Sequence, residues 1–193
     1  MIENNVELSK NETERLNRLE DVRKRKIKML LKWLLVLIIM AGIIYGLVAW
    51  SRYANAHKPG VAFTELARDH IPVGSARPAY NSNPPTSGPH YDTPAAWGFY
   101  DKELPDEQLV HNLEHGGIWI SYKNSKDGNL KQEIKNLVSR YSVKLIASAR
   151  SANDAEVSVA AWGRLLKLDH FDKDKIQKFI NAFVNKGPEN VPY

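Results

Sequence analysis

The chain has 193 residues, of which 43% are hydrophobic and 25% charged, with a formal net charge of +5 and no cysteine. This hydrophobic content is typical of a folded protein and argues against wholesale disorder. The lack of cysteine excludes disulfide scaffolds, iron–sulfur clusters, cysteine-ligated zinc and thiol catalysis. Residues 51–193 carry 18 basic and 16 acidic residues. Because these charges nearly balance and form no basic stripe among aromatic residues, we expect no nucleic-acid partner.

An uncharged apolar run covers residues 33–50, and residues 29–31 lengthen it. About 20 helical residues, rising 1.5 Å each, span the hydrocarbon core of a bilayer. The run therefore predicts a transmembrane helix over residues 29–50, with Trp33 and Trp50 at the two interfaces. A buried helix of a soluble domain is disfavoured, because such a helix is seldom apolar on all faces.

Flanking charge predicts the orientation of this helix. Six basic residues occupy the ten positions before the run, whereas only Arg52 and Lys58 follow it closely. The positive-inside rule then places residues 1–28 in the cytoplasm and residues 51–193 outside. The small residues Ala54-Asn55-Ala56 have the form of a signal-peptidase site. However, the run is longer than the roughly 7–15 residues of a signal peptide, so we expect an uncleaved single-pass anchor in the cell membrane.

The other boundaries follow from changes in composition. We assign residues 51–62 to a linker, residues 63–187 to an extracytoplasmic domain and residues 188–193 to a C-terminal tail. The polar residues 1–28 are either a solvated tail or part of a short coiled coil. Eight of the ten prolines lie between residues 59 and 105. They disfavour regular helix or central strand there and predict a long ordered loop wrapped on the domain.

Periodicity predicts the regular elements of the domain. Their order indicates an α+β fold: a small mixed-sheet α/β sandwich with a right-handed β-α-β crossover over residues 118–149. A thioredoxin-like arrangement is compatible with this order, although without a CxxC motif it could not carry redox chemistry. The expected helices cover residues 65–69 (capped by Thr64), 105–115 (ended by Gly116-Gly117), 130–141 and 176–184, and the expected strands cover residues 118–122, 143–149, 157–162 and 165–168.

Two histidines, His111 and His115, lie four positions apart on a predicted helix and therefore share one face. Zinc and copper take three or four nitrogen or oxygen ligands at about 2.0–2.2 Å, so both imidazoles could meet one ion. His90 follows a restrained turn and is a natural third ligand, and His70 or the carboxylate of Glu114 could complete the shell. We predict a Cu or Zn site formed by these five residues.

Two alternatives remain open for these histidines. In an envelope interaction or structural module, they would instead bond to backbone groups and tie the proline-rich loop to the helix. Residues 111–115 also match the H-x-x-E-H pattern of inverted zinc peptidases, in which a glutamate activates water. A small metal-dependent hydrolase with Glu114 as base is the second alternative. His57 and His170 are expected to be incidental.

Several motifs together resemble those of one known family. They are Arg-Asp-His at 68–70, Tyr-Asn-Ser-Asn-Pro-Pro-Thr-Ser-Gly-Pro-His-Tyr at 80–91, Trp-Gly-x-Tyr at 97–100, Val-His-Asn-Leu-Glu-His-Gly-Gly at 110–117 and Ala-Trp-Gly-Arg at 161–164. Over roughly residues 63–185 the chain resembles an uncharacterised bacterial family catalogued as domain of unknown function 3105. The resemblance implies a single membrane anchor followed by this domain. It also supports reading His90, His111 and His115 as parts of one site, and it implies no activity.

The sequence therefore predicts a membrane-anchored extracytoplasmic binding domain, with a histidine-based transition-metal site as its leading specific role. Convergence of the His90, His111 and His115 nitrogens to within about 3–4 Å would favour metal over a structural role. An open fourth position beside Glu114 would favour a hydrolase.

Overall fold

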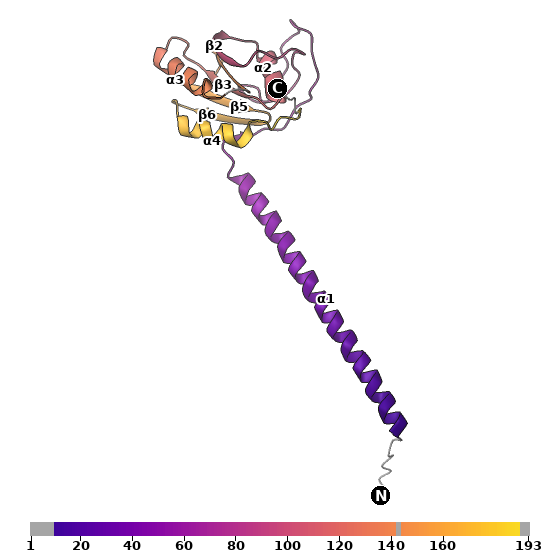
Figure 1. Ribbon diagram of the computed structural model, residues 1–193. Helices are drawn as coiled ribbons and strands as arrows, with labels where there is room; N and C mark the ends of the chain where they lie inside the picture. The colour runs from indigo at the N-terminus through magenta and orange to yellow at the C-terminus, as the bar shows by residue number, and fades with distance from the viewer. Residues whose placement is uncertain (1–9, 142–143, 190–193) are drawn as a thin grey trace. The chain divides into compact units, whose positions relative to one another are not determined.

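The computed structural model describes residues 10–141 and 144–189, and it divides into two units, Met1–His57 and Lys58–Tyr193. Within the first unit, helix α1 (Lys10–Ala56) is drawn as one unbroken ribbon in Figure 1. It is long and apolar enough to cross a membrane, since its most apolar 18-residue window has a mean hydropathy of 2.4. None of that window is buried against other parts of the protein. The predicted transmembrane segment lies inside this helix, which also continues into the segment assigned to a linker.

The second unit is built on a six-stranded mixed sheet of order β1-β6-β5-β3-β4-β2. β4 pairs in parallel with both β2 and β3, and the other three pairs are antiparallel. The mixed sheet predicted from the sequence is therefore confirmed, and its order remains compatible with a thioredoxin-like arrangement. The strands are β1 (Val61–Ala62), β2 (Gly98–Glu103), β3 (Ile118–Tyr122), β4 (Leu145–Ala149), β5 (Val157–Ala161) and β6 (Arg164–Leu168).

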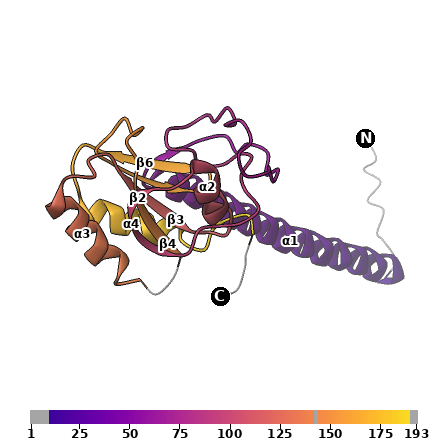
Figure 2. The same ribbon diagram turned by 90° about the horizontal axis from the view of Figure 1, so that it is seen from above.

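Helices cover both faces of this sheet, as Figures 1 and 2 show. Successive strand residues point to opposite faces, so Ile118 and Ile120 of β3 join one core and Trp119 joins the other. Helices α3 (Gly128–Val138) and α4 (Lys173–Phe183) pack into the first core. Helix α2 (Asp106–Glu114) packs into the second, together with side chains from the proline-rich segment. The predicted sandwich is confirmed, and α2 carries two of the predicted ligands, His111 and Glu114, with His115 as its C-cap.

Helix and strand boundaries agree closely with periodicity. The expected helix over residues 105–115 is α2, with Pro105 as its N-cap, and the strand over residues 118–122 is β3. Asp127 caps α3 by accepting a hydrogen bond from the backbone N–H of Leu130 at 3.0 Å. The expected strand over residues 143–149 begins at Leu145, and its first residue, Val143, lies outside the described residues.

Residues 63–97 contain neither helix nor strand apart from an isolated bridge between His70 and His90. The helix predicted over residues 65–69 is wrong. Its backbone groups bond to distant partners instead: the Leu66 N–H donates to Ser87 Oγ at 3.0 Å, and the Asp69 carbonyl accepts from the His90 N–H at 3.0 Å. Strand β2 was not predicted, because its sequence, GFYDKE, has no strict apolar alternation and it pairs on one edge only.

Candidate metal centre

The five predicted ligands come together where α2 ends against the proline-rich segment; they are called the histidine cluster: His70, His90, His111, Glu114 and His115. The Nε2 atoms of His111 and His115 are 3.1 Å apart, which is the spacing expected of two ligands of one ion. The ligand atoms of His70, His90 and His111 all lie within 4.8 Å of one another, and so do those of His111, Glu114 and His115. His111 is common to both groups.

The end of α2 fixes where His115 points. The chain turns at Gly116, whose φ of +76° is a left-handed conformation that glycine adopts at little cost. In this turn the Gly116 N–H donates to the Leu113 carbonyl and the Gly117 N–H donates to the Asn112 carbonyl, both at 2.9 Å. The glycine stop expected from the sequence is thus present, and it ends the helix directly behind His115.

The buried side chain of Asn112 locks the proline-rich segment along α2. Its Oδ1 accepts from the Ala95 N–H at 2.9 Å, and its Nδ2 donates to the Ala95 carbonyl at 2.8 Å. The Tyr91 N–H also donates to the carbonyl of Glu107 at 3.3 Å. Together these bonds fix the chain on the C-terminal side of His90 against the helix.

A turn on the other side of His90 is held by Tyr80. Gly88 has a φ of +124°, and a Cβ there would lie 2.9 Å from the Tyr80 ring. The Tyr80 hydroxyl donates to the Pro89 carbonyl at 2.8 Å. Burial raises the pKa of Tyr80 above its ordinary value, so the phenol remains protonated and able to donate.

Backbone pairing brings His70 beside His90. The His90 N–H donates to the Asp69 carbonyl at 3.0 Å, and the Ile71 N–H donates to the His90 carbonyl at 2.8 Å. The two imidazole rings then lie with their centroids 5.0 Å apart, and the His70 ring stacks on His111 at 5.2 Å. From the sequence, His70 was one of two residues that could complete the ligand shell. The backbone pairing with His90 explains how it reaches the cluster.

The hydrogen bonds of two imidazoles define their tautomers. Nδ1 of His90 lies 2.7 Å from the Gly88 carbonyl oxygen, and Nδ1 of His111 lies 2.6 Å from that of Tyr91. Because a carbonyl oxygen only accepts, we assign the ring proton to Nδ1 in both residues. In the neutral rings, both Nε2 lone pairs then face the cluster. Proteins commonly orient metal-ligating histidines in this way.

Glu114 lies buried among these rings, with 1% of its surface exposed. Its Oε2 is 3.0 Å from His90 Nε2 and 4.0 Å from His70 Nε2, and its Oε1 is 3.6 Å from an Arg68 guanidinium nitrogen. A lone pair on His90 Nε2 and a carboxylate oxygen are both acceptors. They can stay 3.0 Å apart only with a proton or another cation between them.

Two polar residues beside the cluster were missed by the sequence analysis. Arg68 approaches Glu114, and Glu189 Oε2 lies 3.4 Å from His115 Nε2. Glu189 is brought there because its N–H donates to the Glu114 carbonyl at 3.1 Å. Arg68 lies in one of the recognised motifs, but no spacing in the chain points to Glu189, which falls in the segment expected to be a tail.

The surroundings of His111 favour its neutral form. Burial lowers its pKa below the ordinary value of 6.5, and positive charge on His115 or His90 would lower it further. The hydrogen bond to Tyr91 and the Glu114 carboxylate oppose this effect. Because only a neutral imidazole binds a metal ion, a lowered pKa makes His111 available at lower pH than an ordinary histidine.

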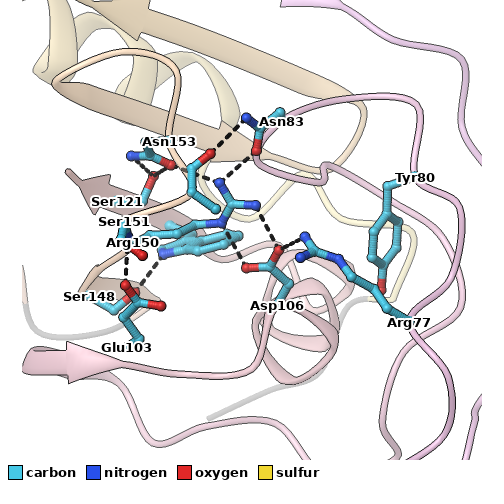
Figure 3. Close-up of polar contacts among 12 residues, drawn as sticks. Arg77, Tyr80, Asn83, Glu103, Asp106, Ser121, Ser148, Arg150, Ser151 and Asn153 are labelled. Carbon is cyan, nitrogen blue, oxygen red and sulfur yellow. Dashed lines mark hydrogen bonds and ion pairs between the residues drawn. The ribbon is translucent and has the colours of Figure 1, made fainter.

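A second buried polar cluster lies at the other end of α2 and is drawn in Figure 3. The Arg150 guanidinium donates to both carboxylate oxygens of Asp106 at 2.8 Å, and to Asn83 Oδ1 at 2.6 Å and Asn153 Oδ1 at 3.0 Å. Arg77 also pairs with Asp106. This arginine–aspartate network ties the first residue of α2 to the end of β4 and to the proline-rich segment. It therefore helps to position the helix that carries His111 and Glu114.

The two remaining histidines lie outside the histidine cluster. His57, next to α1, places its Nδ1 2.7 Å from the Tyr53 carbonyl oxygen. His170 is exposed in the turn before α4. His170 thus provides a natural control for experiments on the cluster.

Comparison with known proteins gives one match. The model of a family described as protein of unknown function (DUF3105) matches residues 73–192. The matched range contains His90, His111, Glu114 and His115, and His70 lies just before it. No curated protein and no solved structure matches the chain.

Proposed function

The chain belongs to the DUF3105 family of proteins of unknown function, and we propose that its folded domain binds one transition-metal ion, zinc or copper, at the histidine cluster. One observation supports this most strongly. Backbone carbonyls hold the Nδ1 protons of His90 and His111, which directs the Nε2 lone pair of His90 toward Glu114 and that of His111 toward His115. A bound cation would satisfy these acceptors together.

The spacing of the donors fits such an ion. Two nitrogens bound to one tetrahedral ion at about 2.0–2.1 Å lie roughly 3.3 Å apart. The 3.1 Å between His111 and His115 is close to this value, and the ligand atoms in each of the two donor groups lie within 4.8 Å of one another. A donor set rich in imidazole favours zinc or copper over calcium or magnesium, which prefer oxygen.

We further propose that α1 anchors the domain in a bacterial cell membrane, with the N-terminus in the cytoplasm and the domain outside. The apolar span and the six basic residues before it support this orientation. A reporter that is active only outside the cytoplasm should be active when fused after Tyr193. An inactive C-terminal fusion together with an active N-terminal fusion would reverse the orientation.

One observation also favours the structural alternative. The bond between His111 Nδ1 and the Tyr91 carbonyl joins the helix to the proline-rich segment, as that alternative requires. The hydrolase alternative has less support, because Glu114 is buried and its Oε1 lies 3.6 Å from an Arg68 guanidinium nitrogen, whose positive charge disfavours protonation of a base.

Metal content separates these possibilities. The full chain, purified in detergent without a histidine tag, should hold about one zinc or copper ion, because the two donor groups share His111. His111→Ala should lose the ion, and the matched control His170→Ala should keep it. If the wild-type protein never holds metal, and the metal-free His111→Ala protein melts earlier, the histidines are structural and the proposal fails.

A further inference from the structure

Among the cluster's imidazoles, that of His70 is the one most open to solvent. Its side chain is 52% exposed, compared with 0% for His90 and 18% for His115. We infer that His70 is an exchangeable ligand, whose place on the bound ion is taken by a donor group of a metal-delivering or metal-accepting partner. This inference rests on the proposed metal site and makes it a transfer site rather than a permanent store.

The way His111 is shared limits the cluster to one ion. Nδ1 of His111 is bonded to Tyr91, so His111 can offer only Nε2. The two donor groups that share His111 therefore compete for one ion and cannot each hold their own. A closed zinc site has four ligands. Glu114 Oε2 lies 3.0 Å from His90 Nε2 and 4.0 Å from His70 Nε2, so it can join His70, His90 and His111 as the fourth ligand. When His70 leaves, His90, His111 and Glu114 still hold the ion.

His70 is the donor held least firmly. His90 and His111 are oriented by hydrogen bonds of 2.7 and 2.6 Å to backbone carbonyls, whereas His70 Nε2 makes a 4.0 Å contact with Glu114. His115 lies deeper and is approached by Glu189. An incoming ligand would therefore meet the ion most readily at the position of His70.

The exchange involves coordination bonds only. An imidazole nitrogen or thiolate sulfur of the partner bonds to the ion as the bond from His70 breaks. The ion keeps its charge, the electron pair of the broken bond stays on His70, and His90 and His111 continue to hold the ion. The probe that mimics such a donor is free imidazole.

The test compares an exposed ligand with a buried one in the tag-free full chain. His70→Ala should weaken zinc affinity at least about tenfold, and millimolar imidazole should restore most of the loss by occupying the vacated position. His90→Ala should also lose affinity, but imidazole should not restore it, because that position is fully buried. His70→Ala keeps the backbone bonds of the bridge to His90, and an unchanged circular dichroism spectrum would verify folding.

The outcomes separate the two proposals. If the wild-type chain binds no zinc, the metal site itself is wrong and the exchange falls with it. If the wild-type chain binds zinc but His70→Ala has unchanged affinity, His70 is not a ligand. If imidazole restores neither variant, or restores both equally, exchange at His70 is wrong although the metal site stands. His70→Gln, which keeps a polar side chain, should behave like His70→Ala.

Discussion

Helix α2 has a buried polar cluster at each end, and the two differ in how their charges are satisfied. At its first residue, Asp106 receives hydrogen bonds from Arg150, whose other nitrogen donates to two asparagine oxygens. At its last turn, lone pairs of His90 and His111 face another acceptor or a second imidazole. A buried network with matched donors and acceptors stabilises a fold, whereas facing acceptors need a proton or another cation between them. We therefore expect the first end to act in stability and, under the proposed function, the other end to bind a metal ion.

Breaking the arginine–aspartate network should have the largest effect on stability. Arg150→Met leaves the buried Asp106 carboxylate without its bidentate partner and should lower the free energy of unfolding by about 3–5 kcal/mol. Chemical denaturation of the full chain in detergent measures this change. The control is Lys167→Met, which breaks the exposed 2.6 Å ion pair with Asp154 and should cost about 0–1 kcal/mol. Equal losses of unfolding free energy in the two variants would show that the network does not stabilise the fold.

The histidine cluster should instead make the stability of the fold depend on bound metal. Zinc at one hundred times its dissociation constant should raise the unfolding free energy of the wild-type chain by about 2.7 kcal/mol. His90→Ala should abolish this gain, while Lys167→Met should retain it. Melting curves with and without zinc give the comparison. A zinc-dependent gain that survives His90→Ala would remove His90 from the site.

The turn before His90, which contains Gly88, should affect both the stability of the fold and zinc binding. Gly88→Ala introduces a Cβ at a φ of +124° and 2.9 Å from the Tyr80 ring, so it should cost about 1–3 kcal/mol and weaken zinc binding. Gly128→Ala is the matched control, because a Cβ there meets no atom within 4 Å. Denaturation and zinc titration of both variants check the prediction. Unchanged zinc affinity in Gly88→Ala would mean that this turn does not orient His90.

The smallest effect expected is a shift in titration. In the metal-free chain, His111 should titrate below 6.5, because burial disfavours its protonated form. Protons should consequently compete with zinc for His111 only at a lower pH than for an ordinary histidine. NMR of the imidazole resonances, assigned with His111→Ala, measures the midpoint. A midpoint at or above 6.5 would contradict the burial described for this ring.

Local patterns explain why much of the fold could be predicted. Strand β3 and the ends of α2 follow from apolar periodicity and from Gly116, and the four-residue spacing placed His111 and His115 on one face. Contacts between distant segments leave no such pattern. Arg150 meets Asn83 across 67 positions, and Glu189 reaches His115 through backbone bonding of the C-terminal segment. The false helix at residues 65–69 has the same origin, since its backbone bonds to remote partners.

X-ray absorption at the zinc edge, on the tag-free full chain loaded with one equivalent of zinc, tests most directly whether the histidine cluster closes around an ion. The account predicts about four nitrogen or oxygen neighbours at about 2.0–2.1 Å, with the outer-shell scattering of at least three imidazoles, and loss of that scattering in His111→Ala. An all-oxygen shell without imidazole scattering, or a spectrum unchanged by His111→Ala, would contradict it.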